Sequence, residues 1–178
     1  MSDTVNFILK IIVIGEPATG KTSLVKKYIS GHFSQDYRAS IGTNMYIKKV
    51  KLDSGDDAKI QLWDIAGQEK WIKMRHVYYR GAQGALVLGD LTREKSFYQI
   101  ESFWREDLLK YCPNIPIILI GNKNDLKMET TKEKVESVGK KLGAVSVIYT
   151  SAKTGDNVKQ AFKTISEIVY KKRLKVQS

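Results

Sequence analysis

Short apolar runs alternate along the chain with segments of helical spacing. The runs are bounded by glycine, proline or polar residues, which is typical of strands. The predicted strands span residues 7–14, 46–52, 59–63, 85–88, 115–120 and 145–149. Ser54-Gly55 predicts a turn that joins the second and third strands as a hairpin. The first run is apolar almost throughout, as expected of a central parallel strand.

Other segments repeat apolar residues every three or four positions, which predicts helices with one buried face. The two clearest sets are Phe97, Ile100, Trp104 and Leu108, and Val158, Phe162, Ile165 and Val169. Residues 21–30 predict a short helix that ends before Gly31. Thr130 and Glu133 match a capping box and predict a helix start near Lys132. We assign these apolar stripes to the core and give them no chemistry.

Alternating strands and helices predict an α/β fold, with helices wound around a mostly parallel sheet. The 178 residues suffice for a single domain with a real core, and we expect that domain to span residues 1–178.

Hydrophobic residues make up 42% and charged residues 28%, as in ordinary globular proteins. No apolar run reaches the roughly 20 residues of a membrane helix. One cysteine, Cys112, excludes an internal disulfide and suits a reducing compartment.

The formal net charge is +11, which makes nucleic acid or an anionic membrane a candidate partner. We favour lysines on solvated faces, because no long basic run precedes the cluster at residues 171–175. That cluster predicts a short basic tail at about 171–178, with weak, salt-sensitive contact with anionic membranes. No cysteine lies near the C-terminus and Ser2 follows Met1, so we expect no lipid anchor in this chain.

Residues 15–22 read G-E-P-A-T-G-K-T and fit the pattern G-x-x-x-x-G-K-[ST] between a predicted strand and a predicted helix. Backbone N–H groups of such a loop wrap phosphates, and the helix dipole adds attraction. Lys21 is expected to reach the β and γ phosphates, and the Thr22 hydroxyl to bind Mg²⁺. A chance glycine turn is the alternative, against which the flanking strand argues. The expected phosphate-binding residues are Glu16, Pro17, Ala18, Thr19, Gly20, Lys21, Thr22, Ser23 and Gly67.

A second motif, W-D-I-A-G-Q at residues 63–68, follows the third predicted strand. Asp64 can hold Mg²⁺ through a water, and Gly67 can bring its N–H close to a γ-phosphate because it has no side chain. Gln68 can orient an attacking water. Taken alone, Asp-x-x-Gly is a common turn, so its meaning depends on its place downstream of the phosphate-binding loop.

A third motif, N-K-N-D at residues 122–125, follows the fifth predicted strand. A carboxylate at Asp125 can accept from the N1–H and the 2-amino group of guanine, donors that adenine does not present in this arrangement. Ser151 is expected to brace the loop, and the Ala152 N–H to donate to the guanine O6. The expected base-binding residues from these segments are Asn122, Lys123, Asp125, Ser151, Ala152 and Lys153.

The motif set resembles that of small GTPases of the Ras superfamily, and W-D-I-A-G-Q-E, Y-Y-R-G-A and S-A-K are similar to the Rab branch. The resemblance covers about residues 7–170. It implies a P-loop NTPase G domain: a six-stranded, mostly parallel sheet with one antiparallel strand and about five helices on both faces. The chain lacks a lipidation cysteine, which suits an archaeal Rab-like protein or a chain cut before its tail, and the sequence leaves both open.

The same resemblance implies a switch that binds GTP or GDP with Mg²⁺ and hydrolyses GTP slowly. It implies protein effectors, an exchange factor and a GTPase-activating protein, and a cytoplasmic location or a peripheral one at a membrane. Switch segments near Ser40 and at 67–79 would be ordered by the γ-phosphate. No motif places an arginine in the site, so a partner is expected to supply one.

Further roles follow by position in the resembled family. Ser40 stands where the switch threonine is usual, and Tyr37 is placed to close over the phosphates. Phe33 stands where an aromatic ring packs against guanine, although a core role is equally open. The implied catalytic residues are Gln68 and Lys21. The implied Mg²⁺ ligands are Thr22, Ser40 and, through a water, Asp64.

Two departures from the family pattern bear on function. Pro17 and Ala18 stand where glycine is frequent, and Pro17 removes one N–H, which leaves its effect on hydrolysis open. The effector-binding aromatic triad would be Met45, Trp63 and Tyr78. One of its aromatics is replaced, so recognition by ordinary Rab effectors is in question.

Three other functions stay open beside the GTP-dependent switch. The first is a GTP-binding module that has lost hydrolysis because of Pro17. A phosphate-binding loop also suits an ATP-using phosphotransferase, against which Asp125 speaks. The basic surface raises a GTPase that docks on RNA, although we do not expect nucleic-acid binding.

Overall fold

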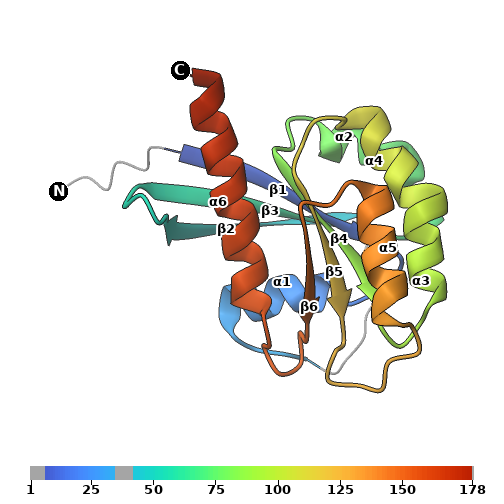
Figure 1. Ribbon diagram of the computed structural model, residues 1–178. Helices are drawn as coiled ribbons and strands as arrows, with labels where there is room; N and C mark the ends of the chain where they lie inside the picture. Colours follow the sequence, from blue (N-terminus) through green and yellow to red (C-terminus); the bar gives the residue numbers. More distant parts are fainter. Residues whose placement is uncertain (1–6, 35–41, 178) are drawn as a thin grey trace.

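A computed structural model describes residues 7–34 and 42–177 and is built on one six-stranded sheet (Figure 1). The strands are β1 (Phe7–Gly15), β2 (Thr43–Lys51), β3 (Asp57–Ile65), β4 (Gly84–Asp90), β5 (Ile117–Asn122) and β6 (Ser146–Thr150). Their order in the sheet is β2-β3-β1-β4-β5-β6, and β2 runs antiparallel to β3 while the other neighbours are parallel. This arrangement confirms the predicted fold.

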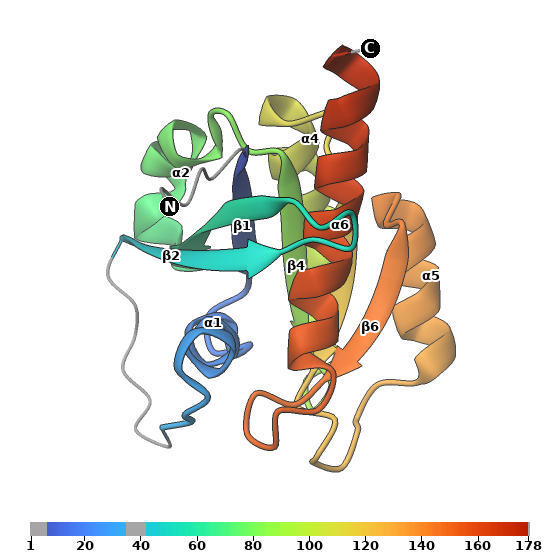
Figure 2. The same cartoon turned by 90° about the vertical axis from the view of Figure 1, so that its left-hand side faces the viewer.

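Helices cover both faces of the sheet (Figure 1; Figure 2). They are α1 (Lys21–Ser30), α2 (Ile72–Tyr79), α3 (Lys95–Gln99), α4 (Arg105–Tyr111), α5 (Lys132–Leu142) and α6 (Val158–Gln177). A 3₁₀ turn at Glu69–Trp71 precedes α2, and a π-helical turn at Ile100–Trp104 joins α3 and α4 into one continuous helix. Residues of α1 and α6 share one apolar cluster, and those of α2, α3, α4 and α5 share the other.

The apolar stripes predicted as core are buried, which confirms that prediction. Strand β1 is apolar almost throughout because its alternate residues pack into the two apolar clusters. Leu9 and Ile11 pack on the side of α1 and α6, whereas Ile12 and Ile14 pack on the side of α2 and α3. A strand covered on both faces has no solvated side and needs no polar alternation.

The start of α5 corrects the predicted capping box. The helix begins at Lys132, but its cap is Thr131, whose side chain accepts the N–H of Lys134 at 3.1 Å. Thr130 is buried one residue earlier, and its hydroxyl has no hydrogen-bond partner within the described residues. Two adjacent threonines offer the same cap chemistry, and burial of the first gave the capping role to the second.

Residues 171–177, which the sequence predicts as part of a basic tail, instead continue α6 past the edge of the sheet (Figure 1). The helix end is held on β1, since Arg173 Nη1 donates to the Ile8 carbonyl at 2.9 Å and the rings of Tyr170 and Phe7 meet edge to face. Within residues 7–34 and 42–177, no helix combines the length and apolar character needed to cross a membrane.

Candidate functional site

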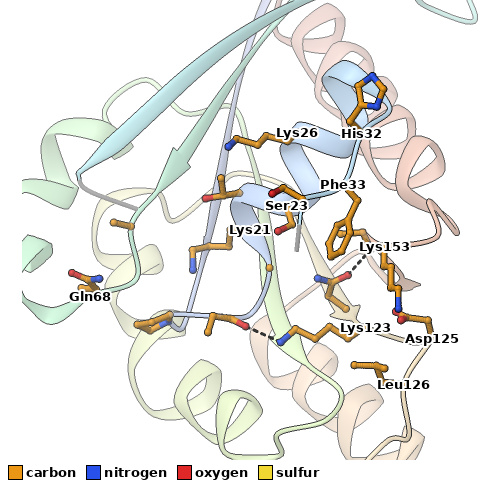
Figure 3. A pocket seen from close by; sticks show the side chains of 18 residues that line it. Lys21, Ser23, Lys26, His32, Phe33, Gln68, Lys123, Asp125, Leu126 and Lys153 are labelled. Carbon is orange, nitrogen blue, oxygen red and sulfur yellow. Dashed lines mark hydrogen bonds between the residues drawn. The ribbon is translucent and has the colours of Figure 1, made fainter. Parts of the chain in front are cut away.

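The carboxyl ends of the parallel strands meet at one edge of the sheet, where α/β folds place ligand sites. A cavity of about 620 Å³ opens there (Figure 3). The predicted site residues that line it are Pro17, Ala18, Gly20, Lys21, Thr22, Ser23, Phe33, Gln68, Asn122, Lys123, Asp125, Ala152 and Lys153. Motifs that lie more than a hundred residues apart in the chain therefore converge on one space.

Other predicted site residues lie behind this lining or beyond the description. Thr19, Asp64 and Ser151 are buried beside the cavity, and Gly67 packs against the loop of residues 15–22. The predicted roles of Ser40 and Tyr37 lie outside the described residues. Sequence reasoning missed five further lining residues: Lys26, His32, Ser34, Ala66 and Leu126. All five are within a few positions of a motif residue, which is the signal that could have found them.

Three consecutive carbonyls of the loop are held by side chains from distant segments of the chain. The carbonyl oxygens of Pro17, Ala18 and Thr19 accept from Arg93 Nη2 at 2.7 Å, Lys123 Nζ at 2.9 Å and Asn122 Nδ2 at 2.9 Å, respectively. In a trans peptide the C=O and the next N–H point in opposite directions. The N–H groups of Ala18, Thr19 and Gly20 therefore face away from these partners, and no acceptor among the described residues takes them.

The Lys21 ammonium lies at the floor of the cavity. It donates to the Gly15 carbonyl at 2.9 Å and to the Glu16 carbonyl at 2.7 Å. Burial lowers the pKa of Lys21 to about 8, against the nearby carboxylates of Asp64 and Glu16, which raise it. A buried cation that is held by neutral carbonyls, next to N–H groups without acceptors, forms a site for an anion.

Two glycines allow close packing around the loop. A Cβ on Gly20, whose φ is +96°, would lie 2.3 Å from Asn122 Nδ2. A Cβ on Gly67 would lie 2.4 Å from the Gly15 carbonyl oxygen and 2.7 Å from the Pro17 nitrogen. Any larger residue at 67 would push the segment that carries Gln68 away from the loop, so glycine sets how closely the two approach.

Asp64 and Thr22 form an oxygen-rich corner below the loop. The Thr22 hydroxyl donates to Asp64 Oδ2 at 2.5 Å, and the other carboxylate oxygen is buried without a partner within the described residues. Burial raises the pKa of Asp64, and the Thr22 hydrogen bond and Lys21 oppose that rise. A buried carboxylate with an unmatched oxygen beside a hydroxyl fits a hard divalent cation such as Mg²⁺.

The far end of the cavity is organised by Asn122 and Ser151. Asn122 Oδ1 accepts from the Thr150 hydroxyl at 3.0 Å, which ties β5 to β6. The Ser151 hydroxyl donates to Asp125 Oδ1 at 2.6 Å and so orients that carboxylate. The Ala152 N–H, which was expected to donate to a base, donates at 3.3 Å to Asn122 Oδ1 here. This long bond is one that a better acceptor can replace.

Phe33 lies on the cavity wall and not in the core. Its side chain is 36% exposed, and Figure 3 shows its ring at the end of the cavity near Lys153, with Gln68 at the opposite end. An exposed aromatic face in a cavity can stack on a planar ring. Of the two roles left open by the sequence, its position favours contact with a ligand.

Glu16 behaves differently from the other loop residues. Its carboxylate turns away and accepts from Trp104 Nε1 at 2.9 Å, so only its backbone belongs to the loop. Two further residues near the loop were not predicted: Asp90, which ends the buried strand β4, and Arg93, which follows it. Their signal was the polar stretch D-L-T-R directly after an apolar run, the same pattern that pointed to residues 122–125.

The residues expected to bind effectors meet on the side of β2 and β3 that faces α2. Met45 pairs directly with Trp63 in the β2–β3 register, and the rings of Trp63 and Tyr78 lie 6.3 Å apart. Met45 is exposed, and Trp63 and Tyr78 are half-buried. The three side chains form one continuous patch.

Comparison with known proteins gives a consistent picture. The Ras family model matches residues 10–171. The Ypt/Rab-type GTPase YPT7 of Saccharomyces cerevisiae is 35% identical over 174 residues, covering 93% of this chain and 83% of that protein. Ras-related protein Rab-1 of Theileria parva is 38% identical over 165 residues, covering 91% and 74%. Human Ras-related protein Rab-32 is 37% identical over 172 residues, covering 93% and 76%.

Proposed function

The chain belongs to the Ras family as a Rab-like small GTPase, and from this premise we propose that it is a GTP-dependent molecular switch with slow intrinsic hydrolysis. The enzyme converts GTP and water to GDP and phosphate. One observation carries the proposal: the cavity lined by the phosphate-binding loop and Lys21 is also lined by Asp125, whose carboxylate is held by Ser151. Phosphate binding and base selection are thus built into a single space of suitable size for a nucleotide.

The phosphates are proposed to bind at the loop and at Lys21. The N–H groups of Ala18, Thr19 and Gly20 are preorganised by the partners of the preceding carbonyls, so little reorganisation is needed as charge develops. Lys21 exchanges its carbonyl partners for phosphate oxygens. Among the residues that line the cavity there is no arginine, so the unaided reaction is proposed to be slow.

Mg²⁺ is proposed to bind at the corner formed by Thr22 and Asp64, the latter through a water, with Ser40 as a further ligand. When bound, the ion neutralises charge between the β and γ phosphates. Gln68, at the end of the cavity away from Phe33, orients the attacking water. Pro17 lies beside this region but leaves Gln68 in place on the cavity wall, so we propose that hydrolysis is retained.

Replacement of Gln68 tests the hydrolytic mechanism. We expect Gln68→Leu to slow single-turnover GTP hydrolysis by roughly 10²-fold, because the water is no longer held in line with the phosphate. Phosphate release from protein loaded with GTP measures the rate, and the affinity for GDP should stay unchanged. The exposed Glu69→Gln is a neighbouring control with no expected effect.

Three results of this assay would contradict the proposal. An unchanged rate in Gln68→Leu would remove Gln68 from water positioning. No phosphate release above background by the unmodified protein would favour a binding module without hydrolysis. Release that persists at full rate in excess EDTA would exclude the proposed Mg²⁺ site.

The pH dependence of nucleotide binding tests the role of Lys21. In the ligand-free protein the pKa of Lys21 is lowered to about 8, so the side chain loses its proton as the pH rises through 8. Phosphates favour the charged form, so binding must restore that proton. We expect the dissociation constant for GDP to rise about tenfold from pH 7 to pH 9. A constant value over this range, measured by fluorescence titration, would contradict the assignment.

The patch of Met45, Trp63 and Tyr78 is proposed as the effector face, with an exchange factor and a GTPase-activating protein as further partners. It joins β2, β3 and α2, and the segment 67–79 includes the residues that should respond to the γ-phosphate. A partner of this face should bind the GTP-loaded protein more tightly than the GDP-loaded protein. Equal binding to both forms would argue against a switch.

The basic end of α6 is proposed as a weak contact for anionic membranes. Lys171 and Lys172 are exposed there, and Leu174 is exposed beside them. A basic cluster of this size gives salt-sensitive binding. Sedimentation with vesicles containing phosphatidylserine measures it, and binding that is unaffected by salt would exclude the electrostatic contact.

A further inference from the structure

Arg93 contacts the phosphate-binding loop from a segment that none of the nucleotide-binding motifs covers. It lies in the turn between β4 and α3, and its Nη2 donates to the Pro17 carbonyl at 2.7 Å. Its side chain is 42% exposed, so the core does not need it for packing. The hydrogen bond to the loop is therefore the main structural reason for an arginine at this position.

A buried carboxylate anchors this contact. Asp90, at the end of β4, is 3% exposed, and its Oδ1 accepts from the N–H and the hydroxyl of Thr92. Its Oδ2 lies 2.6 Å from Lys123 Nζ and 3.8 Å from Arg93 Nε. One carboxylate thus holds two cations, and these two cations hold consecutive carbonyls of the loop.

The Arg93 contact matters for phosphate binding because residue 17 is a proline. Proline has no N–H, so the loop offers no donor at this position, and the next donor is the N–H of Ala18. The Pro17 carbonyl and the Ala18 N–H belong to the same trans peptide, which is planar. When Arg93 holds the carbonyl, the N–H of Ala18 points the opposite way, and Ala18 is one of the residues that line the cavity. Ala18 also has a φ of +63°, an unfavourable value that needs support from its surroundings.

We propose that Arg93 is a positioning residue for nucleotide binding, which fixes the Pro17–Ala18 peptide so that its N–H faces the phosphates. The inference rests on the proposed function, because it assumes that phosphates bind at this loop. Asn122 and Lys123 orient the two following peptides from motif positions. Arg93 adds a third support, from outside the motifs, at the peptide that follows the proline.

The rate of nucleotide release tests this role. Protein loaded with a fluorescent GDP analogue and Mg²⁺ is mixed with excess unlabelled GDP, and the loss of fluorescence is followed. We expect Arg93→Ala to release the analogue roughly tenfold faster, as for loss of a hydrogen bond from a charged donor. Arg93→Lys should restore part of the slow release, because an ammonium can still donate to the Pro17 carbonyl.

Arg105→Ala is a matched control. Arg105 also donates to a backbone carbonyl, that of Lys141 at 2.7 Å, but on α4, at a contact that does not involve the loop. It should leave release unchanged, whereas a general effect of losing an arginine–carbonyl bond would appear in both variants. Thermal unfolding of the nucleotide-free protein should be similar for all three variants, which separates positioning of the bound nucleotide from stability of the fold.

The outcomes separate this inference from the proposed function. A release rate for Arg93→Ala within twofold of the unmodified protein overturns the role of Arg93, while the proposed function stands. Failure of the unmodified protein to retain the GDP analogue overturns the proposed function itself. If Arg93→Ala did not fold, Arg93→Gln provides the neutral donor for the same comparison, and equal release by Arg93→Gln and the unmodified protein would refute a charge-assisted contact.

Discussion

Asp125→Ala is expected to lower the affinity for GTP on the order of 10³-fold, because truncating one partner of a charged hydrogen-bonded pair removes several kilocalories per mole. The Ser151 hydroxyl, 2.6 Å away, already orients this carboxylate in the ligand-free protein. Little conformational entropy is therefore lost at Asp125 when the base binds. The loss should fall on recognition of the base, since the loop and Lys21 are unchanged.

Inosine triphosphate makes this prediction sharper. It keeps the N1–H of guanine and lacks the 2-amino group, so it can donate only one of the two hydrogen bonds to Asp125. The unmodified protein should prefer GTP over inosine triphosphate, and Asp125→Ala should bind the two almost equally. Competition titrations with ATP as a third ligand measure these ratios.

The nearby Asp156→Ala serves as the control. Asp156 is also exposed and its carboxylate accepts from Asn124 at 2.6 Å, but it does not line the cavity. It should leave the preference for GTP unchanged. If Asp125→Ala retained the preference of the unmodified protein for GTP over inosine triphosphate, the base would be recognised elsewhere and the guanine-binding assignment would be wrong.

Lys21→Ala is expected to weaken nucleotide binding to a similar extent, because it removes the buried cation that faces the phosphates. Thermal unfolding shows the effect directly. At a GDP concentration of about 1,000 times the dissociation constant, the unmodified protein gains about 4 kcal/mol of stability from the ligand. A variant that binds 1,000-fold more weakly gains about 0.4 kcal/mol at the same concentration. The ligand-dependent rise in Tm should therefore almost vanish.

Lys27→Ala, on the same helix but outside the cavity lining, is the control for loss of a lysine from α1. It should keep the full rise in Tm with GDP. A normal rise in Lys21→Ala would show that the ammonium contributes little to binding and that the loop N–H groups hold the phosphates alone. The ligand-free Tm separates this result from a folding defect.

Patterns that are local in the sequence predicted most of the fold. Strand β1 and helix α1 were found from an apolar run and a glycine boundary, since both depend on neighbouring residues. The cap of α5 was placed one residue too early, because Thr130 and Thr131 have the same chemistry and only burial distinguishes them. No local sequence pattern indicates the π-helical turn at Ile100–Trp104.

The sequence by itself determined the chemistry of the candidate site, because each motif is contiguous: a loop that binds phosphates ending in Lys21, and Asp125 to select a base. Tertiary structure alone decided how the loop is held, because the partners lie far away in the chain. Arg93 is 76 residues from Pro17, and Lys123 is 105 residues from Ala18. Such contacts depend on strand order, which brings the ends of β1, β4 and β5 together. The local spacing of residues in the sequence cannot indicate them.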